Sequence, residues 1–147
     1  MDIYFKQKTK KRNWKRFWNL MQKEVKIILA EKLEKEYIEL NKIVSKEKKE
    51  SIDSSFHQTL LRAINKNKDL LKINPFYGDP LKKKLIPRQL MQKYDIDNLW
   101  RIELPGYWRM LYSLTGNEVR IICFVLEICN HERYNKLFGY KRKWKQT

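Results

Sequence analysis

The chain has 147 residues and carries 33 lysines and arginines against 17 aspartates and glutamates, which gives a net charge of +16. This length predicts one domain with a core of ordinary size. The charge favours nucleic acid, a ribosome or another polyanion as partner. Lysine-rich surfaces also occur in proteins that bind no polyanion, but here the basic residues gather in residues 6–16, 82–88 and 141–145. Such clustering indicates a binding surface.

Cysteine and histidine usage points away from disulfides, metals and cofactors. Cys123 and Cys129 lie on one predicted strand and match neither a disulfide framework nor a CxxC pair, so we expect small buried thiols in a reducing compartment. His57 and His131 are far apart and form no cluster with metal-ligand spacing. No signal peptide and no membrane-spanning run is recognisable, so we expect a cytoplasmic protein with no membrane partner.

The N-terminal third predicts a strand and then a long helix. Residues 2–7 alternate apolar and other side chains and are a first candidate strand. Between Trp14 and about Lys48 the apolar residues recur at steps of three and four, which predicts one helix with a single apolar stripe.

A second helix is predicted after a polar break at residues 50–55, which offers several N-cap oxygens. It runs from Phe56 to Asn74, because the residue before Pro75 is disfavoured in a helix. The two helices would then form an antiparallel hairpin.

The C-terminal half predicts a β-meander. Residues 81–86 form a short strand or an extended loop, and residues 87–97 are polar and irregular. Three strands joined by tight turns follow, at residues 98–104, 107–114 and 118–128.

This element order predicts an α+β fold, in which a helical hairpin with a long first helix packs on one face of a small antiparallel sheet. We expect a single domain with three parts: a basic strand and long helix over residues 1–50, a helix with the meander over 51–140, and a basic tail over 141–147.

Alternation along the strands sorts their side chains into two faces. One face carries large apolar residues and should cover the helices, namely Trp100, Ile102, Leu104, Trp108, Met110 and Tyr112. Arg101, Glu103, Tyr107 and Arg109 would share the other, open face. Arg109 is a lone arginine in an apolar strand. Burying its charge costs desolvation energy unless the guanidinium group meets an anion. This residue predicts either a phosphate site or an inert ion pair with Glu103 across the strands.

Four segments in this order resemble the RelE/ParE toxin superfamily, and specifically its RelE-like, mRNA-cleaving branch. They are Asn74-Pro-Phe-Tyr-Gly78, Leu99-Trp-Arg-Ile-Glu-Leu104, Trp108-Arg-Met-Leu-Tyr112 and His131-Glu-Arg-Tyr134. The resemblance covers about the C-terminal 60% of the chain, judged by eye. It implies a small antiparallel sheet against a helical hairpin, and a metal-independent endoribonuclease that cuts mRNA on the ribosome and is neutralised by a cognate antitoxin protein.

The resemblance also implies roles for individual residues. Arg109 corresponds to the arginine that holds the scissile phosphate, and Arg101 falls where a catalytic lysine is common. His131 falls at a position held by Arg, Lys or His, and imidazole exchanges protons near neutral pH. Tyr134 is the nearest candidate for the C-terminal tyrosine, with Tyr140 as the second.

Basic and aromatic residues around these positions are candidate RNA contacts that position the backbone without reading sequence. They are Lys82, Lys83, Lys84, Arg88, Arg133 and Tyr140, with Trp144 in the basic tail.

Two departures from the family pattern keep other functions open. Glu103 stands where a second basic residue is frequent, and the spacing from His131 to the tyrosines differs. The chain is therefore either a RelE-like toxin, a RelE-fold protein that binds RNA or the ribosome without cleavage, or a ParE-like inhibitor that binds DNA gyrase.

Overall fold

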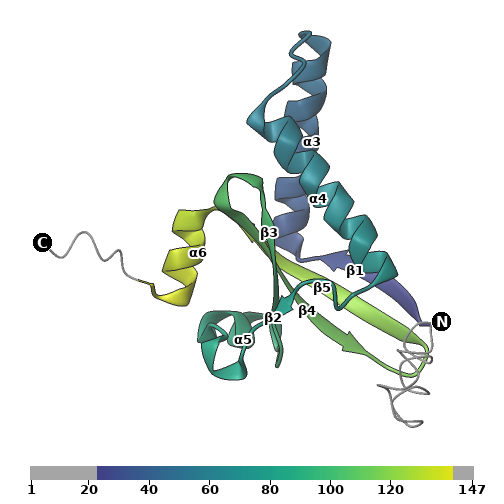
Figure 1. Ribbon diagram of the computed structural model, residues 1–147, viewed down its shortest axis with the longest axis vertical. Coiled ribbons are helices and arrows are strands. Elements are labelled where there is room, and N and C mark those ends of the chain that lie inside the picture. Colours follow the sequence, from purple (N-terminus) through teal and green to yellow (C-terminus); the bar gives the residue numbers. More distant parts are fainter. Residues whose placement is uncertain (1–22, 141–147) are drawn as a thin grey trace, which may run out of the picture.

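A computed structural model describes residues 23–140 of the chain. The candidate strand at residues 2–7, the start of the predicted helix at Trp14 and the basic segments at 6–16 and 141–145, Trp144 included, lie outside the described residues. The elements in chain order are β1 (Glu24–Leu29), α3 (Glu31–Lys49), α4 (Phe56–Ile73), β2 (Asp79–Pro80), a 3₁₀ turn (Lys83–Leu85), α5 (Arg88–Tyr94), β3 (Trp100–Leu104), a second 3₁₀ turn (Pro105–Tyr107), β4 (Trp108–Gly116), β5 (Arg120–Cys129) and α6 (His131–Phe138). The predicted α+β class is confirmed (Figure 1).

The five strands form one mixed sheet in the order β1-β5-β4-β3-β2. Strand β1 runs parallel to β5, and all other neighbours are antiparallel. The prediction of a purely antiparallel sheet was therefore wrong at this edge. Parallel neighbours need a long crossover, and here the helices and the rest of the sheet connect β1 to β5.

The prediction of one long first helix was also wrong, because Glu24–Leu29 is a strand and α3 begins only at Glu31. Side chains of β1 alternate between exposed and half-buried, as in an edge strand covered on one face. Val25, Ile28 and Leu29 fit the helical period, whereas Val25, Ile27 and Leu29 fit the strand period and are the half-buried side chains. Pairing with β5 decides between them, and it continues into Ala30, whose N–H donates to the Val125 carbonyl at 2.8 Å.

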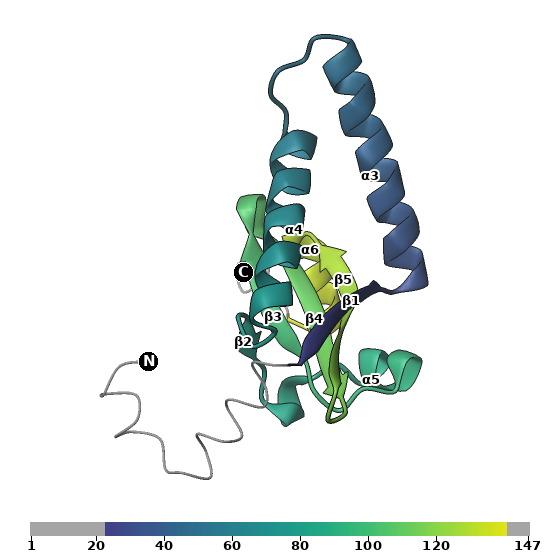
Figure 2. The same ribbon diagram turned by 90° about the vertical axis from the view of Figure 1, so that its right-hand side faces the viewer.

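Helices α3 and α4 lie side by side and extend well beyond the sheet (Figure 2). They meet one face of the sheet in a first core, which includes Leu33, Leu60, Ile64, Leu71, Ile102, Leu104, Met110, Tyr112, Cys123 and Val125. The apolar face predicted from alternation is thus the face that packs on these helices. The N-terminus of α4 is capped as expected, since Ser55 Oγ accepts from the Gln58 N–H at 3.2 Å.

Tyr112 anchors the loop after α4 to this core. Its side chain is fully buried, and its hydroxyl donates to the Pro75 carbonyl and accepts from the Gly78 N–H, both at 2.9 Å. A Cβ at Gly78 would lie 2.7 Å from this hydroxyl oxygen, so only glycine permits the approach. Both hydrogen-bonding functions of Tyr112 are therefore used within the protein.

The opposite face of the sheet is not open, in contrast to the prediction. Helices α5 and α6 cover it (Figure 1) and form a second core with Ile86, Leu90, Leu99, Leu111, Leu126, Cys129, Tyr134 and Leu137. Residues 87–97 were expected to be irregular, but α5 spans seven of them and is too short to show a clear period. His131 is the first residue of α6, and Asn130 caps this helix by accepting from the Arg133 N–H at 2.8 Å.

Cys123 and Cys129 are both free and buried, as expected from the sequence. Burial raises the pKa of each thiol to about 12, because a thiolate loses its hydration in an apolar core. Within residues 23–140, no helix combines the length and apolarity that crossing a membrane requires.

Candidate functional site

Two arginines on neighbouring strands meet a buried tyrosine at the margin of the second core. Arg101 of β3 and Arg109 of β4 lie on the same sheet face, and Tyr134 of α6 lies over both. Arg101 Nη1 donates to Tyr134 Oη at 2.9 Å. The guanidinium carbon of Arg109 lies 4.9 Å from the centre of the Tyr134 ring, within cation–π distance. The structure thus brings three predicted catalytic residues together.

Each of the two guanidinium groups keeps one polar atom without a partner. Arg101 Nε and Arg109 Nε are buried, and no hydrogen-bond acceptor among residues 23–140 reaches either atom. Across the described residues, no carboxylate oxygen lies within 4.0 Å of either guanidinium group. A buried donor without a partner costs roughly 1–3 kcal/mol, and an anion placed here would remove that cost.

The alternative ion pair between Arg109 and Glu103 is not formed. The two residues are direct partners across β3 and β4. Arg109 nevertheless turns its Nη1 to the backbone carbonyl of Tyr107. The positive charge of Arg109 is therefore not neutralised by its cross-strand neighbour.

The charge of Arg101 is stabilised by its surroundings. The hydrogen bond to Tyr134 raises the pKa of Arg101, against the opposing effect of burial, and the charges of Glu103 and Asp79 raise it further. A guanidinium group is protonated throughout the physiological range. Arg101 is therefore a permanent cation that cannot take up or release a proton for catalysis.

His131 lies next to this cluster at the exposed start of α6. Its ring centre is 6.2 Å from that of Tyr107, and its Nε2 is 3.1 Å from Asn135 Nδ2. Tyr107 links His131 to the arginine cluster, because its ring lies beside His131 and its carbonyl accepts a hydrogen bond from Arg109. The predicted acid–base residue is thus accessible to solvent, whereas Tyr134 is only 4% exposed.

A hollow of about 410 Å³ opens at the turn between β3 and β4. It is lined by Glu103, Leu104, Gly106, Tyr107, Trp108 and Arg109. Tyr107 was not predicted as a site residue, although an aromatic residue directly after Pro105-Gly106 between two strands is a signal for an exposed ring at a tight turn. Its φ of 62° and its 76% exposure distinguish it from the other tyrosines of the site.

The remaining predicted RNA contacts lie either at α6, near the arginine cluster, or between β2 and α5. Tyr140 is half exposed and lies beside Tyr134, with 6.3 Å between ring centres. Arg133 is engaged within the protein, since its Nε lies 3.6 Å from Glu127 Oε1. The side chains of Lys82, Lys83, Lys84 and Arg88 are exposed between β2 and the start of α5. Arg101 and Arg109 instead bond to Tyr134 and to the Tyr107 carbonyl.

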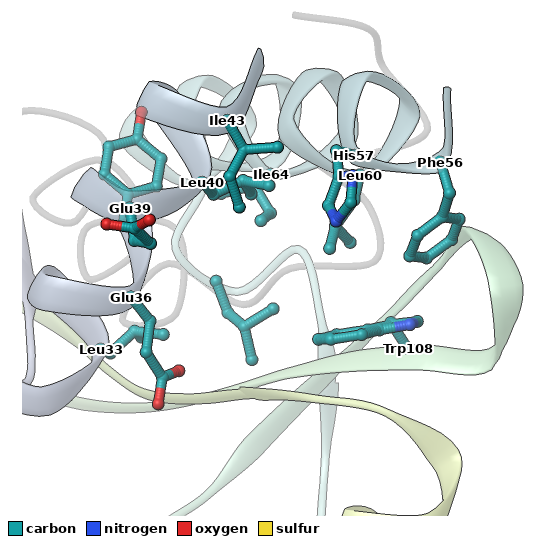
Figure 3. A pocket seen from close by; sticks show the side chains of 12 residues that line it. Leu33, Glu36, Glu39, Leu40, Ile43, Phe56, His57, Leu60, Ile64 and Trp108 are labelled. Atoms are coloured by element: carbon teal, nitrogen blue, oxygen red, sulfur yellow. The ribbon is translucent and has the colours of Figure 1, made fainter. Parts of the chain in front are cut away.

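A second, apolar hollow of about 420 Å³ lies on the other side of the sheet, between α3, α4 and the strand ends (Figure 3). Its wall is formed by side chains such as Leu40, Ile43 and Leu60, and Phe56 and Trp108 close one end with 6.0 Å between ring centres. Glu36 and Glu39 lie at its α3 side. His57 also lines the groove, with its Nδ1 3.4 Å from Glu47 Oε2. The lining residues that the structure describes include no arginine or lysine to hold a phosphate.

We compared the chain with protein-family models, with curated proteins and with solved structures, and none matched. Within residues 23–140, no three His, Cys, Asp or Glu side chains are grouped as metal ligands.

Proposed function

We propose that this chain is a RelE-like toxin, an endoribonuclease that cuts mRNA on the ribosome without a metal and so inhibits translation. The observation that carries the proposal is the pair of buried, unpartnered Nε atoms on Arg101 and Arg109, next to an exposed histidine. Guanidinium groups hold phosphate with two parallel hydrogen bonds. Two of them on one face, without carboxylate partners, suit a scissile phosphate.

The chemistry needs three contributions. The RNA 2′-hydroxyl loses a proton and attacks the adjacent phosphorus, charge builds on the phosphoryl oxygens, and the 5′-oxygen leaves with a proton. Arg109 and Arg101 would stabilise the charge on the phosphoryl oxygens. His131 would exchange the proton, since it is exposed and lies beside the arginine cluster. Tyr134 would position Arg101 through the 2.9 Å hydrogen bond rather than transfer a proton.

The arrangement of the helices supports a RelE-like fold. Helices α3 and α4 pack together on the face of the sheet that carries Met110 and Tyr112, as the family resemblance implies for its helical hairpin. We include in the proposal a cognate antitoxin that binds the apolar groove of Figure 3, and action in the cytoplasm, where the mRNA substrate is translated.

A second candidate function is an RNA- or ribosome-binding protein that does not cleave. One observation favours it: the hydroxyl of Tyr134 is buried and already accepts from Arg101, which leaves His131 as the proton-transfer group of the cluster. Glu103 beside Arg109 adds negative charge where a second cation would help catalysis. This candidate predicts salt-sensitive RNA binding without cuts.

The test is primer extension on a reporter mRNA in a translating extract, with the parent protein and with Arg109→Ala. We expect discrete cuts that weaken about 100-fold or more in the variant, because removing one charge-stabilising donor typically costs that much. Arg120→Ala is the matched control, since Arg120 is exposed and pairs with Glu24 at the far edge of the sheet. Cutting by Arg109→Ala at the parent's rate would contradict the proposal, and RNA binding without cuts by the parent would favour the second candidate.

A further inference from the structure

The hollow at the β3–β4 turn has features that phosphate binding does not need. Tyr107 presents a ring that is 76% exposed, on a backbone with a φ of 62°. This left-handed conformation is unfavourable for a residue with a Cβ and persists only where other contacts hold it. The guanidinium of Arg109 provides such a contact, through the hydrogen bond to the Tyr107 carbonyl. An aromatic ring held out in solvent beside a phosphate clamp is a platform for a nucleobase.

Glu103 supplies the polar wall of the same hollow. Its side chain is exposed, and among residues 23–140 no basic nitrogen lies within 4.0 Å of its carboxylate. The two oxygens of this group can each accept a hydrogen bond and donate none. The carboxylate of Glu103 therefore matches a ligand edge with two adjacent donors.

Among the four RNA bases, guanine has such an edge. Its Watson–Crick side carries the N1–H and the N2 amino group next to each other, and these match the two oxygens of a carboxylate. Adenine and cytosine place an acceptor nitrogen beside their amino group, and uracil flanks its single N–H with two carbonyls, so a carboxylate would face repelling lone pairs. The volume of about 410 Å³ lies within the range of small-ligand pockets, roughly 300–1,000 Å³.

We propose that the hollow at the β3–β4 turn is a guanine subsite, in which an unpaired guanine of RNA stacks on Tyr107 and donates two hydrogen bonds to Glu103. Arg109 lies in the wall of this hollow and across the strands from Glu103, so the phosphate that it binds belongs to the same or the adjacent nucleotide. The inference rests on the proposed function in one respect, namely that RNA is the ligand of the arginine cluster. It assigns to Glu103, which departs from the family pattern, the choice of base.

The test is fluorescence anisotropy with the full chain and short, end-labelled single-stranded RNAs. The RNAs differ at one position, which is guanine, inosine or adenine in a background without other guanines. We expect at least 10-fold tighter binding of the guanine RNA than of the adenine RNA. Inosine keeps N1–H but lacks the amino group, so its affinity should lie between the two.

Variants assign the preference to named residues. Glu103→Gln should remove the guanine preference and leave binding of the adenine RNA equal or tighter, because the carboxamide offers one acceptor and carries no negative charge. Glu118→Gln is the matched charge control at the other end of β4, and it should keep the preference. Tyr107→Ala should weaken binding of all three RNAs about 3-fold or more, whereas Tyr77→Ala, which removes an exposed ring outside the hollow, should not.

The outcomes separate this inference from the proposed function. RNA binding that depends on Arg109 but shows no base preference, or a preference that survives Glu103→Gln, would overturn the guanine subsite and leave the endoribonuclease proposal standing. A guanine preference that Glu103→Gln abolishes, in a protein that never cuts mRNA, would support the subsite and overturn the endoribonuclease. Absence of RNA binding by the parent would overturn the guanine subsite. The endoribonuclease proposal would still be decided by primer extension, because the proposed cleavage takes place on the ribosome.

Discussion

The two faces of the sheet each bury a tyrosine, and they use it differently. On the α3–α4 face, the Tyr112 hydroxyl both donates and accepts a hydrogen bond from backbone groups of the preceding loop. On the α5–α6 face, the Tyr134 hydroxyl accepts from Arg101, and its ring lies against Arg109. On the first face, the buried tyrosine hydroxyl therefore has both a donor and an acceptor as partners. The second leaves two guanidinium Nε atoms unsatisfied.

Hydrogen-bond pairing separates the two faces by their contribution to stability. Buried polar groups that are fully paired specify a fold, whereas unpaired ones are a cost that a ligand can remove. The α3–α4 face therefore behaves as the structural core of the molecule. The α5–α6 face carries a similar apolar core, but at its margin lie Arg101 and Arg109, whose Nε atoms have no partner among the described residues.

The largest expected effect comes from exchanging each tyrosine for phenylalanine. Tyr112→Phe leaves the Gly78 N–H and the Pro75 carbonyl without their partner and should lower the free energy of unfolding by about 2–3 kcal/mol. Tyr134→Phe should cost less than about 1 kcal/mol, because the partly exposed Arg101 can bond to water instead. Urea denaturation measures both values. Equal losses of unfolding free energy in the two variants would mean that the two tyrosine hydroxyls contribute equally to stability.

An intermediate effect is expected from alkaline pH, since each core contains one buried thiol. Cys123 belongs to the α3–α4 core and Cys129 to the α5–α6 core, and burial raises the pKa of each from 9.0 to about 12. The unfolded chain therefore releases these protons first. Stability is fully present below pH 9 and is lost as the pH rises from about 9 towards 12, by roughly 1 kcal/mol per thiol at pH 10.

Urea denaturation between pH 7 and 10.5 checks this, with Cys123→Ala and Cys129→Ala as single variants. Each variant should lose about half of the pH dependence that the two thiols contribute, whatever its stability at pH 7. An unchanged slope in Cys129→Ala would mean that water reaches the α5–α6 core, and the two faces would then differ in burial as well as in polar pairing.

The smallest effect is expected for Arg133, which lies beside the cluster but is paired with Glu127. A cation already engaged by a carboxylate contributes little to a new anion. Arg133→Gln should change RNA affinity less than about 3-fold in anisotropy measurements, whereas Arg109→Gln should change it at least 10-fold and reduce the slope against salt. Equal losses from both arginines would mean that the RNA-binding site extends along α6 and includes Arg133.

Much of the meander could be predicted from the sequence because its signals are local. Strict alternation around Trp100 and Met110, with turn residues at Pro105-Gly106, defines strands and faces without knowledge of the rest of the chain. The same alternation placed Arg101 and Arg109 on one face. The second helix was also predictable, because a cap at Ser55 and a stop at Asn74 are local features.

The parts that were wrong depend on contacts between distant segments. β1 has apolar spacing that fits a helix or a strand, and its parallel pairing with β5 decides between them. Neither α5 nor α6 has enough turns for a clear period, so the helices that cover the second face could not be recognised from the sequence.

The amino-acid sequence by itself determined the α+β class, the basic charge and the two arginines on one sheet face, because composition, period and turn chemistry are properties of short segments. Only the tertiary structure decided that Arg109 bonds to the Tyr107 carbonyl rather than to Glu103, and that Tyr134 closes over both guanidinium groups. Those contacts join residues from different elements, and hydrogen bonds and desolvation act on atoms in space. The site therefore exists only in the folded chain.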